Sequence, residues 1–268
     1  MDKNSVIRHY AETNEERDTL SHVLDLAERS RLRDIVESGN FMSDALRMRT
    51  DEMLSRLGYE AYFFFGGYEG AERTCPVFYT EYCTSDIIKE SPDLAEIVFL
   101  KATLDRFNKG AELSHRDVLG SLMGLGIERD AVGDIVIDEG FVIIAVRESI
   151  SAFILDSLLK ISRYPVSVSV AEKPNIKRKD DFEEGFDTVA SLRLDAVASS
   201  LFSTSRSSSA DAIEMGLVAV NGATVKKTDF AVSEGDKISW RGNGRAQIEK
   251  IDGLSKKGRV RILYKRWK

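Results

Sequence analysis

The stretch Ser191–Ile238 constrains the fold of this chain more than any other part of its sequence. Leu194, Val197, Ala198 and Leu201 follow the i, i+3, i+4, i+7 spacing of one buried helical stripe. This spacing predicts a short amphipathic helix whose apolar side packs against a neighbouring element.

A second helix and a hairpin are predicted directly after it. Ala210, Ile213 and Leu217 repeat the helical spacing, and Gly216 stands where a helix commonly ends in a left-handed residue. Asn221-Gly222 then lies between β-forming residues, which is the strongest short signal for a tight hairpin. The stretch therefore predicts two short helices followed by a small β hairpin.

Basic and hydroxyl side chains gather at the starts of these elements. Arg193 opens the first helix, Arg206 opens the second between the N-cap candidates Ser205 and Ser207, and Lys226-Lys227 follow the hairpin turn. A helix N-terminus carries unpaired N–H groups and a partial positive charge, so it suits a phosphate. The pattern indicates a surface that holds nucleic acid by its phosphates. The alternative is a compact helix–hairpin unit whose basic side chains are only solvated.

The order of these residues resembles the S4-type RNA-binding domain, which also occurs in some tRNA synthetases and pseudouridine synthases. The likeness covers most of Ser191–Trp240. The residues that carry it are Arg193-Leu-Asp195, Ser205-Arg206-Ser207, Ala210, Ile213, Gly216, Val218, Val220-Asn221-Gly222, Lys226-Lys227 and Gly235-Asp236-Lys-Ile238.

Charge is distributed unevenly along the chain. The net charge is −6, yet Asp187–Lys268 contains 15 Lys and Arg against 9 Asp and Glu, and Arg241–Lys268 contains 10 against 2. A basic end on an acidic body is typical of a nucleic-acid-binding surface. We therefore add Arg241 and Arg245 to the predicted RNA contacts, with a solvated basic tail as the alternative.

Several classes of protein and site are disfavoured. The longest apolar run, Phe141–Val146, is far too short to span a bilayer, and the N-terminus carries no apolar signal-peptide core. Cys75 and Cys83 are not spaced as in zinc motifs. We expect a cytoplasmic protein with reduced thiols, no metal, no cofactor and no membrane partner.

The N-terminal part predicts helices followed by strands. Helices are expected within Thr13–Ser38 and from Ser43 to Leu57, and strands at Tyr59–Phe65 and around Pro76–Tyr82. The glycine-bearing segment Gly66–Arg73 between the strands fits neither a P-loop nor a dinucleotide fingerprint. A turn that redirects the two strands is favoured over a phosphate cradle.

The middle of the chain predicts a βαββαβ order, which is the ferredoxin-like plan shared by RNA-recognition folds. An RNA-recognition domain shows stacking aromatics on its third strand, where this sequence has only Phe141. Ser114 and Asp117 predict a helix cap rather than an acid–base site. The expected elements are strand 95–100, helix 114–125, strand 134–138, strand 141–146, helix 147–161 and strand 166–170.

We predict an α+β fold of three domains. An N-terminal α/β domain covers residues 1–90, and a ferredoxin-like domain that resembles RNA-recognition folds covers 91–172. A charged linker follows at 173–186, and the S4-type αα-β domain with its basic tail occupies 187–268.

The whole chain resembles the bacterial YlmH family. The resemblance implies a non-catalytic RNA-binding protein whose partners are rRNA and tRNA on a large ribosomal subunit obstructed by peptidyl-tRNA, in ribosome-associated quality control. The family is also linked to cell division by gene neighbourhood. One departure is Asn40-Phe-Met-Ser-Asp-Ala45, where the family more usually has Thr-x-Phe-Leu-x-Pro. The motifs that carry the likeness are Gly66-Gly67-Tyr68, Ala71-Glu72-Arg73, His115-Arg-Asp-Val-Leu-Gly120, Leu125-Gly126-Ile127-Glu-Arg129, Gly133-Asp134-Ile135, Ser191-Leu-Arg-Leu-Asp195 and Arg241-Gly-Asn-Gly-Arg245.

Three functions are compared on this basis. The first is a monomeric RNA-binding adaptor in which Asp195 orients a neighbouring basic residue and Asn221 either contacts RNA or serves its turn. The second is an RNA-modifying enzyme, a pseudouridine synthase or methyltransferase; it is disfavoured because the G-x-G at Gly242-Asn-Gly244 lies in a basic loop. The third is a cell-division interaction protein, for which no basic amphipathic helix is visible. The predicted RNA-binding residues are Arg193, Ser205, Arg206, Ser207, Asn221, Lys226, Lys227, Arg241 and Arg245.

Overall fold

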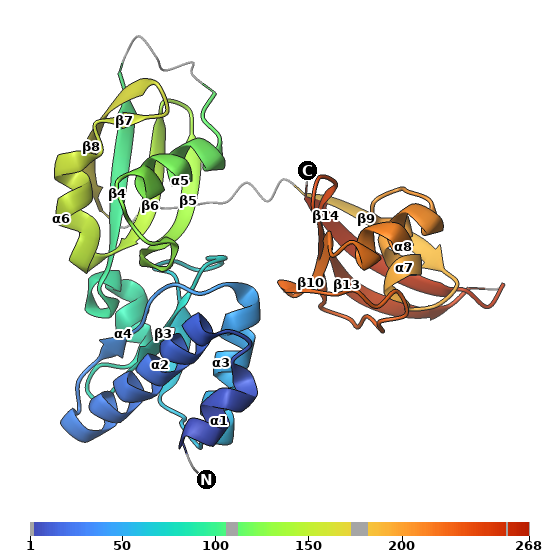
Figure 1. Ribbon diagram of the computed structural model, residues 1–268, viewed down its shortest axis with the longest axis horizontal. Coiled ribbons are helices and arrows are strands. Elements are labelled where there is room, and N and C mark those ends of the chain that lie inside the picture. Colours follow the sequence, from blue (N-terminus) through green and yellow to red (C-terminus); the bar gives the residue numbers. More distant parts are fainter. Residues whose placement is uncertain (1–2, 106–111, 173–181, 256, 268) are drawn as a thin grey trace. The chain divides into compact units, whose positions relative to one another are not determined.

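The computed structural model describes residues 3–105, 112–172, 182–255 and 257–267 (Figure 1). The chain forms two compact units, Met1–Ile176 and Lys177–Lys268. Both units combine helices with sheets, so the α+β class is confirmed. The predicted N-terminal and middle domains lie together in the first unit.

The N-terminal part of the first unit packs helices on a small sheet whose strand order is β1-β3-β2. Ser43 begins α3 by accepting a hydrogen bond from the Leu46 amide at 3.3 Å, as its sequence position predicts. Helix α1 was not predicted from the sequence. The elements are α1 (Lys3–Tyr10), α2 (Asn14–Arg33), β1 (Glu37–Ser38), α3 (Asp44–Arg56), β2 (Tyr62–Phe65) and β3 (Cys75–Phe78), followed by α4 (Ser85–Glu90) and a 3-10 turn (Pro92–Ala95).

The middle part has the predicted ferredoxin-like arrangement, with strand order β5-β6-β4-β8-β7. Ser114 and Asp117 form a reciprocal capping box at the start of α5, which confirms the predicted cap. The helix expected to reach residue 161 ends at Ser157, because the chain reverses at Ser162 (φ 55°) and pairs Lys160 with Pro165. The elements are β4 (Ile97–Leu104), α5 (His115–Gly124), β5 (Val132–Asp138), β6 (Phe141–Arg147), α6 (Glu148–Ser157), β7 (Lys160–Ile161) and β8 (Tyr164–Ala171).

The two faces of the middle sheet bury different partners. Leu100 and Ile144 pack on the core that includes Val118 of α5 and Ile154 of α6. On the other face a separate core joins the middle sheet to the N-terminal part, and the face that carries stacked bases in RNA-recognition folds is therefore partly covered. The residues of this second core include Ile97, Phe99, Ile143 and Ala145 from the sheet with Phe41, Phe65, Tyr68, Cys75 and Val77 from the N-terminal part.

The second unit is a six-stranded antiparallel sheet, ordered β11-β10-β12-β13-β14-β9, with two helices against one side (Figure 1). Its core joins Val197 and Ile213 of the helices to Ile238, Ile248 and Ile262 of the sheet. The elements are β9 (Phe182–Val189), α7 (Leu194–Leu201), α8 (Arg206–Glu214), β10 (Val218–Val220), β11 (Ala223–Thr224), β12 (Lys237–Trp240), β13 (Gly244–Leu254) and β14 (Val260–Trp267).

The predicted hairpin is confirmed at Asn221-Gly222. Val220 pairs with Ala223 across a two-residue turn. Asn221 and Gly222 have φ values of 51° and 81°, as the favoured two-residue hairpin turn requires.

The predicted charged linker is wrong over residues 182–186, which form the first part of β9; its remaining residues 173–181 lie outside the described residues. Glu183 and Glu184 of β9 lie opposite Arg266 and Lys265 of β14, and Glu183 pairs with Arg266 at 3.2 Å. Strand β14, with which β9 pairs, is about 80 positions away in the sequence. The local charge pattern does not reveal this pairing and by itself favoured a linker.

Candidate nucleic-acid interface

A buried carboxylate lies at the centre of the predicted RNA-binding residues. Asp195, at the start of α7, is 5 % exposed. Arg193 donates from Nε to Oδ1 and from Nη2 to Oδ2, both at 3.1 Å, and Arg206 donates from Nε to Oδ2 at 3.1 Å. Burial would raise the pKa of Asp195, but the hydrogen bonds from the two arginines outweigh it and hold the pKa below its ordinary value. The ionised carboxylate therefore fixes both guanidinium groups, as its predicted orienting role requires.

Both guanidinium groups remain open to solvent on their other side. The side chains of Arg193 and Arg206 are 42 % and 52 % exposed. Each uses its Nε and Nη2 groups for Asp195 and keeps its Nη1 donors for another ligand. Two positive charges share one negative charge, so the pair keeps a net positive charge in a fixed geometry that suits phosphate oxygens.

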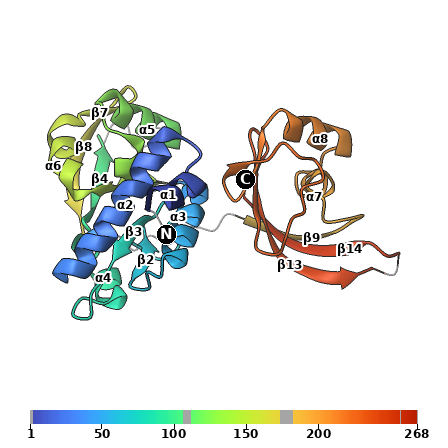
Figure 2. The same cartoon turned by 60° about the horizontal axis from the view of Figure 1, so that its bottom comes forward.

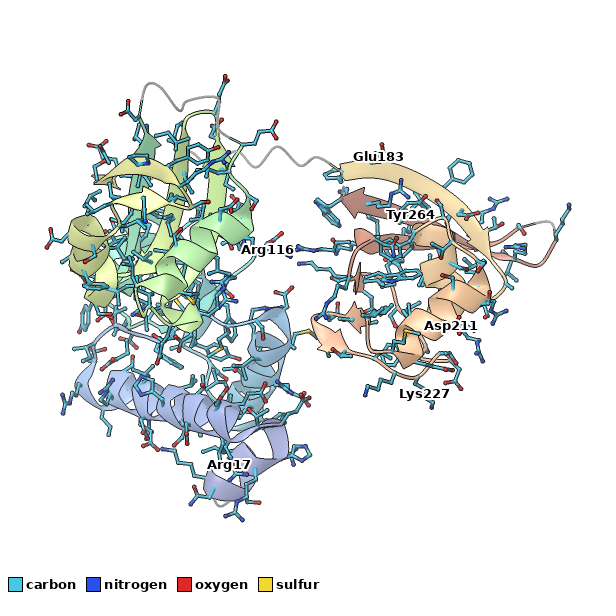
Figure 3. The ribbon with its side chains drawn as sticks, turned by 45° about the horizontal axis from the view of Figure 1, so that its top comes forward. Arg17, Arg116, Glu183, Asp211, Lys227 and Tyr264 are labelled. Atoms are coloured by element: carbon cyan, nitrogen blue, oxygen red, sulfur yellow. The ribbon has the colours of Figure 1, made fainter. Side chains whose placement is uncertain are left out.

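The loop after β11 brings a lysine to the same place. The Phe230 and Thr228 carbonyls accept from the amides of Leu194 and Asp195, at 2.8 and 3.1 Å. This pairing holds the loop beside the start of α7. Lys227 on this loop is exposed, with its Nζ 3.8 Å from Asp229 Oδ1 (Figure 3). We call Asp195, Arg193, Arg206 and Lys227 the Asp195 cluster.

The same hydrogen bonds correct one expectation. The first amides of α7 were expected to be available to a phosphate. The amides of Leu194 and Asp195 instead bond the loop, and the Ala196 amide bonds the Asp195 carboxylate at 2.8 Å. Guanidinium and ammonium groups, rather than the α7 backbone, form this part of the surface.

The start of α8 is built by serines. Ser205 is the N-cap and accepts from the Ser208 amide at 3.1 Å, while the hydroxyls of Ser205 and Ser207 lie 3.0 Å apart. The sequence reasoning missed Ser209, which is fully buried and donates to the Asp195 carbonyl at 2.7 Å. This bond fixes α8 against α7, and no local sequence signal distinguishes Ser209 from its serine neighbours.

The other predicted residues lie elsewhere on the unit. Lys226 lies beside Gly216 and the Arg241 amide bonds the Leu217 carbonyl at 2.9 Å, so both are near the far end of α8. Arg245 lies on β13 beside Ala246, whose side chain is in the core, so Arg245 points to the sheet face away from the helices.

Asn221 has a structural role in the turn. Its Nδ2 donates to Asp236 at 2.8 Å and its Oδ1 accepts from the Lys237 amide at 2.9 Å. These bonds tie the hairpin to the segment before β12. Of the two roles expected for Asn221, the turn role is the one that this geometry supports.

In the first unit, the loop Gly66–Arg73 closes on an internal carboxylate. Asp134, 6 % exposed, accepts from the Glu72 and Arg73 amides at 2.8 and 2.9 Å and from the Tyr68 hydroxyl at 2.5 Å. Two of the loop amides that a phosphate cradle could use, those of Glu72 and Arg73, are therefore bound to Asp134. The predicted turn is the interpretation that this geometry supports.

The cysteines and the acidic side chains show no arrangement typical of a reactive or metal site in the described part of the chain. Burial raises the pKa of the Cys75 thiol to about 11. No three His, Cys, Asp or Glu side chains of the described residues gather to hold a metal. No described helix is long and apolar enough to cross a bilayer.

Comparison with known proteins identifies the family. A model of the S4 domain matches residues 192–238, and a model described as "Putative RNA-binding domain in YlmH" matches residues 98–175. The chain is 35 % identical over 231 residues to the ribosome-associated protein quality control protein P2 of Bacillus subtilis (strain 168), covering 85 % of this chain and 87 % of that protein. The chain belongs to the YlmH family.

A solved structure, the cell division protein ylmH from Streptococcus pneumoniae, is 22 % identical with a TM-score of 0.45 and covers 60 % of this chain and 94 % of that chain. On the chain described here, the S4 match at residues 192–238 includes the whole Asp195 cluster and ends before β13. The family and its S4 domain make this an RNA-binding protein.

Proposed function

We propose that this protein is a non-catalytic RNA-binding factor that binds rRNA and tRNA on the large ribosomal subunit, where peptidyl-tRNA obstructs it, in ribosome-associated quality control. The observation that carries the proposal is the pair of arginines fixed on the buried Asp195 carboxylate. The printed name of the Bacillus subtilis relative supports the ribosome as the place of action.

The charge of the chain supports the S4 unit as the RNA-binding part. Residues 1–186 contain 23 Lys and Arg against 35 Asp and Glu, whereas residues 187–268 contain 15 against 9. Phosphate-rich RNA is repelled by a net acidic body and attracted by a basic unit. The Asp195 cluster offers fixed cationic donors there, which suit recognition of RNA backbone geometry rather than of base sequence.

A modifying enzyme is the less supported alternative. The Glu72 and Arg73 amides are bound to Asp134, and Asp117 accepts from the Ser114 hydroxyl at 2.6 Å in its helix cap. The groups in the first unit that a phosphate-binding or acid–base site would use are therefore engaged in holding the fold.

Sucrose-gradient sedimentation of tagged protein, followed by sequencing of crosslinked RNA, tests the proposal. We expect co-migration with large subunits and tRNA among the crosslinked RNAs. Arg206→Glu is expected to release the protein from the particle, whereas Arg17→Glu, the same charge change on the exposed surface of α2, is the matched control (Figure 3). Sedimentation of the wild type away from ribosomes would contradict the proposal.

A further inference from the structure

The sheet of the second unit has a face that neither α7 nor α8 covers. Figure 2 shows β9 and β14 with one side turned away from both helices. Along these strands, core residues such as Ile262 alternate with residues that point the other way. The outward residues stand opposite one another in four pairs, one of which is Thr188 with Arg261. The other three pairs are Phe182 with Trp267, Glu184 with Lys265 and Phe186 with Leu263.

Large apolar groups are exposed on this face. Phe186 is 82 % exposed and its partner Leu263 is 38 % exposed. The rings of Phe182 and Trp267 meet edge to face with centroids 5.9 Å apart, and Lys265 Nζ lies 4.6 Å from the Phe182 ring centroid. Adjacent exposed aromatic and aliphatic side chains on one sheet face are typical of a binding surface.

Cations border these rings. The pairing of β13 with β14 extends the outward-pointing residues onto β13, where Arg245 stands opposite Trp267 and Lys250 opposite Leu263. Arg261 points to the same side of β14, two positions before Leu263. Lys265 is paired with Glu249 at 2.5 Å. Lys250 Nζ lies 3.9 Å from Asp252 Oδ1. We call this surface the outer sheet face; it has four cations, Arg245, Lys250, Arg261 and Lys265, against the three carboxylates of Glu184, Glu249 and Asp252.

We propose that the outer sheet face binds unpaired RNA, with bases stacking on Phe186 and on the Trp267 ring while Arg245, Lys250 and Arg261 contact the phosphates. Aromatic rings on a sheet stack bases of any sequence, and neighbouring cations follow the backbone. The excess of cations favours an RNA over an apolar protein surface as the occupant. This contact goes beyond the proposed function, because it uses residues separate from the Asp195 cluster and does not require the ribosome.

Binding of two labelled RNAs to the full chain tests the proposal. One probe is a 12-nucleotide oligoadenylate and the other is a blunt stem-loop, each followed by fluorescence anisotropy. Phe186→Ala is expected to weaken oligoadenylate binding about tenfold, as loss of one stacked base predicts, with little effect on the stem-loop. Phe186→Tyr keeps the ring and is expected to bind as the wild type does.

The Asp195 cluster gives the opposite pattern, which separates this proposal from the proposed function. Arg206→Glu is expected to weaken stem-loop binding and to leave oligoadenylate binding nearly unchanged. Because Phe186 is so exposed, its truncation leaves the core intact. Unchanged oligoadenylate binding by Phe186→Ala would overturn the proposal, even if the protein still failed to bind ribosomes after Arg206→Glu.

Tryptophan fluorescence gives a second readout. The chain has two tryptophans; Trp240 is in the core and Trp267 is on the outer sheet face. Oligoadenylate is expected to quench the emission, and Trp267→Phe is expected to remove that quenching. An unquenched wild type contradicts base stacking. If the Phe186→Ala variant no longer binds a protein that the wild type binds, while its affinity for both RNAs is unchanged, the occupant of this face is a protein. That outcome would refute the RNA proposal.

Discussion

Arg206 and Asp195 are joined across the two helices of the second unit, with Arg206 Nε 3.1 Å from Asp195 Oδ2 and Nη2 3.3 Å from Oδ1. The planar guanidinium matches the carboxylate with two donors, which a lysine ammonium cannot do. The contact fixes the direction of the remaining donors of Arg206 as well as the packing of α8 on α7. Its loss therefore has consequences for both RNA binding and stability.

Replacing Arg206 is expected to weaken the binding of stem-loop RNA uniformly across stem sequences. Arg206→Gln removes one phosphate contact, so the slope of log affinity against log salt is expected to fall by about one unit. Arg206→Lys keeps the charge but not the two-donor geometry, and we expect an intermediate affinity. Filter binding at several salt concentrations measures both. If Arg206→Gln and the wild type show equal slopes of log affinity against log salt, Arg206 does not contact an RNA phosphate.

Asp195→Asn is expected to destabilise the second unit by about 1–3 kcal/mol, because the charged hydrogen bonds from two arginines lose their ionised acceptor. The pKa of Asp195 lies below 3.8, so the native state binds fewer protons than the unfolded state. The contribution of this carboxylate to the free energy of unfolding is therefore present above about pH 4 and is lost as pH falls through the folded pKa. Urea denaturation from pH 3 to 7 should show the difference between variant and wild type shrinking in acid.

Asp134→Ala is expected to destabilise the first unit by about 3 kcal/mol, because two amides and a tyrosine hydroxyl lose a buried acceptor. Tyr68→Phe removes only one of these bonds and should cost about 1 kcal/mol. Urea denaturation measures both variants. RNA affinity should stay at the wild-type value in each; a specific loss of RNA affinity in a folded variant would show that the Gly66–Arg73 loop binds RNA.

The stability of the first unit is expected to depend on pH through His115. Partial desolvation lowers the pKa of His115 from its ordinary value, and the positive charge of Arg129 lowers it further. The unfolded state therefore binds this proton more readily, and the melting temperature is expected to fall as pH drops below 6.5. Thermal denaturation between pH 5 and 7.5 tests this. His115→Gln should show a flatter profile, and an unchanged profile would exclude His115 as the titrating group.

Gly185 allows Tyr264 to pack across the pair β9–β14. A Cβ added at Gly185 would lie 2.5 Å from Tyr264 Cζ, so Gly185→Ala forces the ring to move. We expect a loss of about 1–3 kcal/mol in the free energy of unfolding. Combining it with Tyr264→Leu should restore part of that loss relative to the sum of the single variants. Strict additivity would show that the two positions do not clash.

Local signals predicted the parts of the fold that local interactions determine. The Asn221-Gly222 turn, the Ser43 cap and the Ser114–Asp117 box depend on neighbours within a few residues, and each is present. Strand β9 was missed because its pairing with β14 joins residues distant in the sequence. Tertiary pairing of this kind overrides the local charge pattern.

The same limit applies to the candidate site. The sequence identified Arg193, Arg206 and Lys227 as separate basic residues at element starts. Only the folded chain shows that Asp195 and the loop ending near Phe230 bring the three together. It also shows that Arg245 belongs to the opposite face of the sheet, which follows from strand alternation once the register is known.

The place of β9 at the edge of the sheet decides where this unit can be cut from the rest of the chain. The S4 match begins at residue 192, after β9 has ended. A fragment that starts there leaves the eight residues of β14 with unpaired backbone groups along one side. Such an edge is a template for pairing with other chains, so a fragment begun at residue 192 should self-associate while one begun before Phe182 stays monomeric.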